Sequence, residues 1–198
     1  MLILRYSPAS PYARKVRIAA ALLGLADRLQ IEGVDLADPA DSIRTQNPLG
    51  KIPTLVLEDG ATLYDSRVIS EYLDWLAGGG RLIPTEPTRR FIALRLQALG
   101  DGINDAALLL RYEETSRPLE QRSEAWTTLQ RGKVSRGLAA LEAAPPAGAI
   151  DIGHVAVATA LGYQDLRFAG SWRATHPRLV AWLDDFAAKA PAFEATQA

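Results

Sequence analysis

Hydroxyl and carboxyl side chains stand at two points where the sequence predicts that a helix begins. Ser10 precedes Pro11, and a serine followed by proline is a typical helix start. The N–H groups at a helix start attract anions, so Ser10 is suited to bind an anion with its hydroxyl and nearby amides. Asp65 and Ser66 precede a second helical pattern. There Ser66 suits a carboxylate and Asp65 an ammonium group, so the pair suits the zwitterion of an α-amino acid.

Basic side chains follow the first of these helix starts. Arg14, Lys15 and Arg17 lie in the first two turns, where each opposes the helix dipole by about 0.3–1 kcal/mol. An anion near Ser10 would relieve that repulsion. The alternative is that Ser10 and Asp65 are helix caps only, and that the basic residues form a solvated face.

A proline segment lies between the two helix starts. It reads NPLGKIPTL, from Asn47 to Leu55, and places Pro53 directly before a strand pattern. Proline has no N–H for a strand ladder, so Pro53 predicts a sheet edge or an irregular entry to the strand. An edge at that point leaves the backbone of Ile52 free to pair with an extended ligand. The alternative is an ordinary loop proline.

The elements that must position these residues divide the chain in two. Residues 1–77 alternate strand and helix patterns in the order β-α-β-α-β-β-α, which predicts an α/β domain. Residues 78–87 contain three consecutive glycines and two prolines, which predicts a linker. Residues 88–198 carry only helical patterns, which predicts an all-helical second domain.

Element boundaries follow from periodicity and from turn residues. In the first domain we expect strands at 1–6 and 29–34, a helix from Ser10 to about Leu25, a short helix near Ser42, a hairpin at Asp59-Gly60 and a helix opening at Asp65-Ser66. In the second domain we expect helices from about Thr88 to Glu114, from Leu119 to Ala143, from Asp151 onward, and from Pro177 to Ala188.

Composition excludes several classes of function. The 22 Lys and Arg side chains balance 23 Asp and Glu, so the chain has no excess of positive charge that would indicate binding to nucleic acid or an anionic membrane. The chain has no cysteine, so any sulfur chemistry must come from a ligand. It has two histidines, so a poly-histidine metal site is not expected. No apolar run is long enough to span a bilayer, and we expect a soluble, cytoplasmic protein.

Three segments together carry a resemblance to a known family. YSPASPYARKVR (6–17), NPLGKIPTLVLEDG (47–60) and LYDSRVISEYL (63–73) precede a helical half that contains DIGHVAVATALGYQDLRF (151–168). This order resembles the cytosolic glutathione S-transferases of bacteria over nearly the whole chain. The resemblance implies a thioredoxin-like N-terminal domain, an all-α C-terminal domain and glutathione as co-substrate. It also implies a role in detoxification and a homodimer with active sites near the subunit interface.

The resemblance also implies roles for the residues that match its motifs. Asp65 and Ser66 would hold the γ-glutamyl end of glutathione. The backbone of Ile52, beside a cis Pro53, would pair with the cysteinyl unit, and Lys51 could approach the glycyl carboxylate.

Ser10 would face the glutathione sulfur. A free thiol has a pKa near 8.5, and lowering it by about two units requires about 2.7 kcal/mol of preferential thiolate stabilisation. A hydroxyl donor, a helix start and nearby cations could together supply this energy. Tyr6 is the main alternative to Ser10, because some members use a tyrosine at the end of the first strand, and Ser7 or no hydroxyl at all is a further one.

The second substrate is the least determined part of this prediction. Leu108, Arg111 and Tyr112 could line its pocket. Asp151 and His154 stand where many relatives have a Ser or Thr and an Asp that cap the buried helix. Here we expect Asp151 to cap and His154 to make another structural contact.

Two other functions remain open. The stretch KVRIAAA (15–21) resembles a glutathione-dependent double-bond isomerase branch, although the serine-cysteine cluster expected before it is missing. A non-catalytic binding or adaptor protein on the same fold is the other, and the zwitterion pocket argues against it. The lack of cysteine disfavours reductases that form a mixed disulfide with their own nucleophile.

Overall fold

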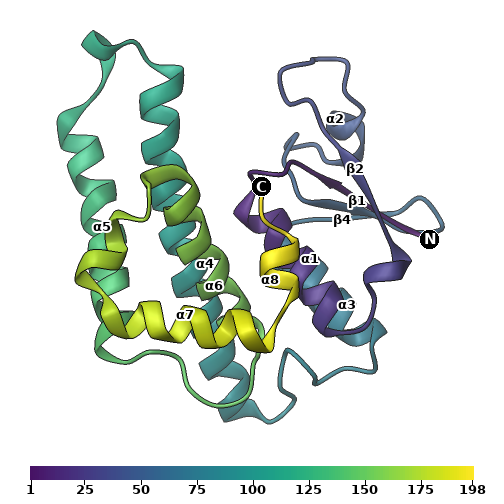
Figure 1. The fold of residues 1–198 in the computed structure, drawn as a ribbon. Coiled ribbons are helices and arrows are strands. Elements are labelled where there is room, and N and C mark those ends of the chain that lie inside the picture. The colour runs from purple at the N-terminus through teal and green to yellow at the C-terminus, as the bar shows by residue number, and fades with distance from the viewer.

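A four-stranded mixed sheet flanked by helices forms the N-terminal part of the protein, in a computed structural model that describes residues 1–198 (Figure 1). The strand order is β2-β1-β3-β4, and β1 pairs parallel to β2 and antiparallel to β3. This arrangement confirms the predicted thioredoxin-like order β-α-β-α-β-β-α. The elements are β1 (Leu2–Tyr6), α1 (Pro11–Leu22), β2 (Leu29–Gly33), α2 (Ile43–Gln46), β3 (Thr54–Val56), β4 (Thr62–Leu63) and α3 (Ser66–Leu76).

Strand β1 alternates between two faces of the sheet. Leu2 and Leu4 are buried in the core that α1 and α3 share, whereas Arg5 points to the other face. There the Arg5 guanidinium donates to Oγ of Ser42 at 2.7 Å and to Oε1 of Gln46 at 2.6 Å, at either end of α2. An apolar core on one face and a buried cation on the other therefore hold the two helical layers to the sheet.

Helix α1 ends at Leu22, three residues before the predicted end. Gly24 adopts a left-handed conformation with φ of +75°, which a glycine accepts without a steric penalty. The N–H of Leu25 then donates to the carbonyl of Ala20 at 2.8 Å, and the N–H of Gly24 donates to Ala21 at 3.0 Å. This glycine termination overrides the apolar pattern that continues to Leu25.

The C-terminal part is all-helical, as predicted. Its long helices are α4 (Pro87–Ser116), α5 (Glu124–Ala143), α6 (Ile152–Phe168) and α7 (Pro177–Lys189), followed by the short α8 (Ala192–Ala195). The second of these begins five residues later than predicted, because Ser123 caps it by accepting from Trp126 N at 3.2 Å. No helix combines the length and the hydrophobicity that a membrane span needs.

Helix α6 lies at the centre of the molecule, between α1 and α4 (Figure 1). Every residue from Ile152 to Gln164 is buried. Gly100 of α4 allows the close approach, since a Cβ there would lie 2.6 Å from the carbonyl carbon of Ala156. The α8 segment returns along α1, so that the C-terminus lies near the beginning of α1 (Figure 1).

Candidate functional site

The sheet register brings the predicted binding segments to the same end of the strands. β1 pairs with β3 through Leu4 and Leu55, and β3 pairs with β4 through Leu55 and Leu63. If both antiparallel ladders are continued, Tyr6, Pro53 and Asp65 fall in line across the sheet. The loop that leads to α1, the turn before β3 and the start of α3 therefore meet at this end of the sheet.

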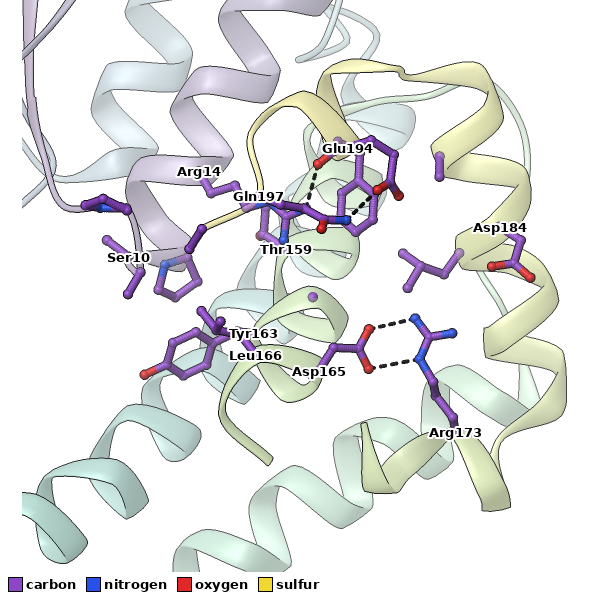
Figure 2. A pocket seen from close by; sticks show the side chains of 18 residues that line it. Ser10, Arg14, Thr159, Tyr163, Asp165, Leu166, Arg173, Asp184, Glu194 and Gln197 are labelled. Atoms are coloured by element: carbon purple, nitrogen blue, oxygen red, sulfur yellow. Dashed lines mark hydrogen bonds and ion pairs between the residues drawn. The ribbon is translucent and has the colours of Figure 1, made fainter. Parts of the chain in front are cut away.

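Ser10 caps α1 and keeps a proton to donate. Its Oγ accepts a hydrogen bond from the N–H of Ala13 at 3.2 Å. A hydroxyl has two lone pairs and one O–H, so this bond leaves the O–H free for an anion. Ser10 also lines a cavity of about 260 Å³ between α1, α6, α7 and the C-terminal segment (Figure 2). Capping and anion binding are thus compatible at this residue.

The segment before β3 is held rigidly around Pro53. The Ile52–Pro53 peptide bond is cis, as the family resemblance implies. Buried Asn47 donates to the carbonyl of Lys51 at 3.0 Å, and the hydroxyl of Thr54 donates to the same carbonyl at 2.9 Å. The backbone N–H and carbonyl of Ile52 make no hydrogen bond within the protein.

Strand β3 is not an edge strand, because β1 and β4 flank it. Of the two possibilities that Pro53 left open, the irregular entry is the one observed. Ile52 precedes the paired residues, which begin at Thr54, and so its backbone is free for a reason other than a sheet edge. The Lys51 side chain is exposed next to it.

Asp65 and Ser66 form the start of α3 as predicted. Oδ1 of Asp65 accepts from the N–H of Arg67 at 2.8 Å, which makes Asp65 the N-cap and leaves Oδ2 without a partner. Ser66 is buried, and its hydroxyl makes no hydrogen bond with another protein group. One carboxylate oxygen and one hydroxyl are therefore available to a ligand at this helix start.

Tyr6 lies apart from the cavity that Ser10 lines. Its ring is half-buried against the core, and the Arg17 guanidinium lies 5.5 Å from the ring centroid. The carbonyl of Ser7 accepts from the N–H of Ser10 at 3.0 Å, which fixes the loop between them. Neither Tyr6 nor Ser7 lines the cavity shown in Figure 2.

The basic residues of α1 do not form a solvated face, and they do not act together on one anion. Lys15 is completely buried and pairs with Asp101 of α4, with Nζ 2.7 Å from Oδ1. Arg17 donates to the carbonyl of Thr196 at 3.4 Å. Only Arg14 lines the cavity with Ser10, and burial lowers the pKa of its guanidinium to about 10. The prediction of three cations around Ser10 is therefore wrong for Lys15, whose charge is already paired.

The α4 residues predicted for a second substrate follow Asp105, which contacts α1 near its start. The Tyr12 hydroxyl donates to Asp105, and Leu108 and Tyr112 follow Asp105 by one and two turns of α4. Arg111 is 3.8 Å from Glu114. None of Leu108, Arg111 and Tyr112 lines the cavity with Ser10, so their role stays a prediction.

Several lining residues of this cavity were not found from the sequence. Tyr163 and Leu166 come from α6, and Phe193 comes from the C-terminal segment. The pattern of α6 indicates burial on most sides and does not mark which residues border a cavity. Asp165 of the same helix is paired with Arg173, with Nη2 to Oδ2 at 2.6 Å (Figure 2).

His154 completes a capping box, so the expectation that it makes a contact unrelated to capping is wrong. Asp151 Oδ1 accepts from the N–H of His154 at 3.1 Å, and Nδ1 of His154 lies 3.4 Å from the N–H of Asp151. The imidazole thus does the work that an acidic side chain does at this position in many relatives. No group of three or more acidic or histidine side chains is arranged to hold a metal ion.

Comparison with known proteins supports the geometry. The family model "Glutathione S-transferase, N-terminal domain" matches residues 4–81, and "Glutathione S-transferase, C-terminal domain" matches residues 124–185. A glutathione transferase family member from Pseudomonas fluorescens Pf-5, with bound glutathione, is 43% identical and has a TM-score of 0.93, covering 100% of this chain and 98% of that chain. A structure of a family member from the same organism with bound S-(propanoic acid)-glutathione is 42% identical, has a TM-score of 0.89 and covers 100% and 99% of the two chains.

A curated relative covers most of the chain as well. The GST-like protein YibF of Escherichia coli K12 is 32% identical over 182 residues, which is 89% of each chain. The two domain models, the full-length structural match and this relative agree with the arrangement described above, a sheet-containing N-terminal domain followed by a helical domain. The chain therefore belongs to the glutathione S-transferase family.

Proposed function

We propose that the protein is a glutathione S-transferase that binds glutathione across the strand ends at Tyr6, Pro53 and Asp65 and activates its thiol. The free Oδ2 of Asp65 would pair with the γ-glutamyl ammonium group, and the Ser66 hydroxyl with the adjacent carboxylate. The unpaired backbone of Ile52 would bind the cysteinyl unit, and exposed Lys51 would approach the glycyl carboxylate. Each polar part of glutathione then meets a group of opposite charge or complementary hydrogen-bonding capacity.

Ser10 would activate the thiol. Its O–H is free to donate because Oγ serves α1 only as an acceptor. Bound glutathione would lose its thiol proton to solvent, and the thiolate would attack an electrophilic carbon. A carbon–sulfur bond forms, and the bond to the leaving group breaks, so that the leaving group departs with its electron pair.

One observation carries this proposal: three segments that are far apart in the sequence offer free groups near the same end of the sheet's strands. These are the Ser10 hydroxyl, the Ile52 backbone and the Asp65–Ser66 pair. The glutathione bound to the Pseudomonas fluorescens relative supports the ligand. The S-(propanoic acid)-glutathione bound in the second structure is glutathione with a carbon substituent on sulfur, which is the class of product that such a transfer yields.

We also propose a two-fold symmetric homodimer. Helix α4 exposes Phe91 and Ile92, and α3 exposes Val68 and Trp75. Exposed large apolar side chains favour association, and an isologous contact is the commonest geometry. The long α4 is the proposed interface element.

Calorimetric titration with glutathione, followed by a turnover screen, tests the proposed function. The screen covers aryl halides, epoxides, peroxides and disulfides. We expect saturable binding and glutathione-dependent consumption of at least one electrophile. Binding without any turnover would favour the adaptor function, and turnover of an isomerisable substrate without net consumption of glutathione would favour the isomerase.

A further inference from the structure

Arg14 differs from the other basic residues of α1 in that its charge faces the cavity. Its Nε donates to Oγ1 of Thr196 at 3.3 Å, and its Nη2 donates to the carbonyl of Phe193 at 2.6 Å. Both partners are uncharged, and Arg14 makes no ion pair with a carboxylate. The third nitrogen, Nη1, has no hydrogen-bond partner in the protein and is not sealed from the cavity. One donor of a charged guanidinium is thus left over, and the nearby Glu194 carboxylate acts on that charge without forming an ion pair with it.

The surroundings keep this guanidinium in place. Its carbon lies 4.2 Å from the centroid of the Phe193 ring, a stacked cation–π contact. Gly162 of α6 provides the space beside this pair, because a Cβ at this position would collide with Nη1 of Arg14 and lie 3.4 Å from the Phe193 ring. The cavity wall is therefore shaped around Arg14, with one planar face covered and Nη1 lying against Gly162.

Arg14 lies on the same side of α1 as Ser10. Residues four apart on a helix have Cβ atoms about 5–6 Å apart, and Ser10 and Arg14 are linked by the N–H of Arg14 donating to the carbonyl of Ser10 at 3.0 Å. Both residues line the same cavity, and Figure 2 shows them on its α1 side. A group attached a few bonds from a sulfur held at Ser10 can therefore reach Nη1 of Arg14.

The acidic residues of the cavity restrict the size of such a ligand. Asp165 is paired with Arg173, and Glu194, whose charge also acts on Arg14, accepts from the Gln197 side chain. Asp184 and Arg173 lie across the cavity from Ser10 (Figure 2). A long acidic ligand would bring its charge close to Asp184, which has no ion-pair partner, whereas a short one would keep its charge beside Arg14.

We propose that Arg14 is the residue that selects the second substrate, and that it selects a small electrophile bearing a carboxylate near its reactive carbon. This inference rests on the proposed function, because it assumes that the sulfur of glutathione lies at Ser10. The carboxylate would accept from Nη1 of Arg14, and the remaining nitrogens would continue to hold the C-terminal segment. A neutral amide of the same shape would lose the charge-assisted bond.

Two glutathione conjugates of equal shape test this selection by calorimetry without any turnover. S-(2-carboxyethyl)glutathione carries the carboxylate, and S-(2-carbamoylethyl)glutathione carries the neutral amide. We expect the wild type to bind the carboxylate at least about 10-fold more tightly, a typical effect of one charge-assisted hydrogen bond. Equal affinity for the two conjugates would overturn the inference. Failure of glutathione itself to bind would instead overturn the proposed function.

Variants separate recognition from a structural role. Arg14→Met should abolish the preference, and Gly162→Ala, which displaces Nη1 but leaves Arg14 in place, should reduce it. Arg17→Met is the matched control, because Arg17 also holds the C-terminal segment but does not line the cavity, and it should retain the preference. If Arg14→Met does not fold, Arg14→Lys keeps the charge without the planar fork and should retain only part of the preference. A preference that survives Arg14→Met, or that Arg17→Met removes equally, would contradict selection by Arg14.

Discussion

Nζ of Lys15 lies 2.7 Å from Oδ1 and 2.9 Å from Oδ2 of Asp101, and both side chains are almost completely buried. Oδ2 of Asp101 also accepts from Nε of Arg67 at 2.9 Å. This cluster joins α1, α3 and α4, and so it connects both helix starts of the proposed glutathione site to the helical domain. Burial lowers the pKa of Lys15, and the carboxylate of Asp101 opposes that effect.

Removing one member of this pair should destabilise the fold. Asp101→Asn leaves the Lys15 ammonium buried without a counter-charge, and we expect a loss of about 3–5 kcal/mol in the free energy of unfolding. The double variant Lys15→Met/Asp101→Leu should recover most of this loss. Urea denaturation followed by circular dichroism measures both, and equal stability of the single variant and the wild type would refute the expectation.

Glutathione affinity should depend on Asp65 and Ser66. Ser66→Ala removes a hydroxyl that the fold does not use, so it should weaken binding by about 10- to 150-fold, or about 1.5–3 kcal/mol, without changing stability. Asp65→Asn keeps an oxygen that can cap α3 but removes the negative charge, and it should weaken binding to a similar extent. Calorimetric titration gives the affinities, and wild-type binding by both variants would exclude the zwitterion pocket.

Ser10 should control the pKa of the bound thiol. Ser10→Ala removes the hydroxyl, together with about 1 kcal/mol of stability from the helix cap, so the thiolate absorbance near 240 nm should titrate closer to the value of free glutathione. Glutathione bound to Tyr6→Phe should titrate as it does in the wild type, because the Tyr6 ring lies against the Arg17 guanidinium and does not line the cavity. The reverse pattern would transfer the role to Tyr6, and an unchanged pKa in both variants would leave the helix start and Arg14 as the activating groups.

The α4 cap should make stability depend on pH. Hydrogen bonds from the N–H groups of Arg89 and Thr88 lower the pKa of Glu86, so its contribution is present above the ordinary glutamate pKa. That contribution is lost as pH falls through the lowered folded-state value. The difference in melting temperature between wild type and Glu86→Ala should therefore be largest near pH 7 and should shrink as the pH falls below the ordinary glutamate pKa. A difference that does not change with pH would mean that the Glu86 charge is irrelevant.

A single charge introduced on α4 should disrupt the proposed subunit interface. Sedimentation of the wild type should give twice the 21.4 kDa chain mass, and Phe91→Glu should shift the equilibrium to the monomer because it places a carboxylate on an apolar α4 face. Tyr112→Glu, elsewhere on the exposed surface of α4, is the control. A concentration-independent monomer of the wild type would contradict the proposed dimer.

The order of strands and helices could be predicted from the sequence because it depends on local periodicity and turn residues. Hairpin Asp59-Gly60 and the caps Ser10 and Asp65 are local signals of this kind, and each is found where expected. The contacts that build the cavity are not local. Arg14 donates a hydrogen bond to the carbonyl of Phe193, which lies 179 residues later in the chain, and the sequence pattern around neither residue predicts this contact.

Two misjudged residues show the same limit. Lys15 has the sequence environment of a surface lysine on a helix, and only the distant Asp101 explains its burial. His154 lacks the acidic group that normally completes a capping box, and its imidazole replaces that group only because Nδ1 reaches the backbone of Asp151. In both cases the side chain's role depends on the geometry of its partner and not on its own type.

The burial of α6 has a consequence for how the molecule unfolds. Because α1 covers one side of α6 and α4 covers another, neither half of the chain can lose its structure without exposing the apolar helix to water. The free energy for opening either half then includes the surface they share, so the two halves should melt in a single cooperative transition. A cut in the glycine-rich segment between them would leave two fragments that each depend on the other to fold.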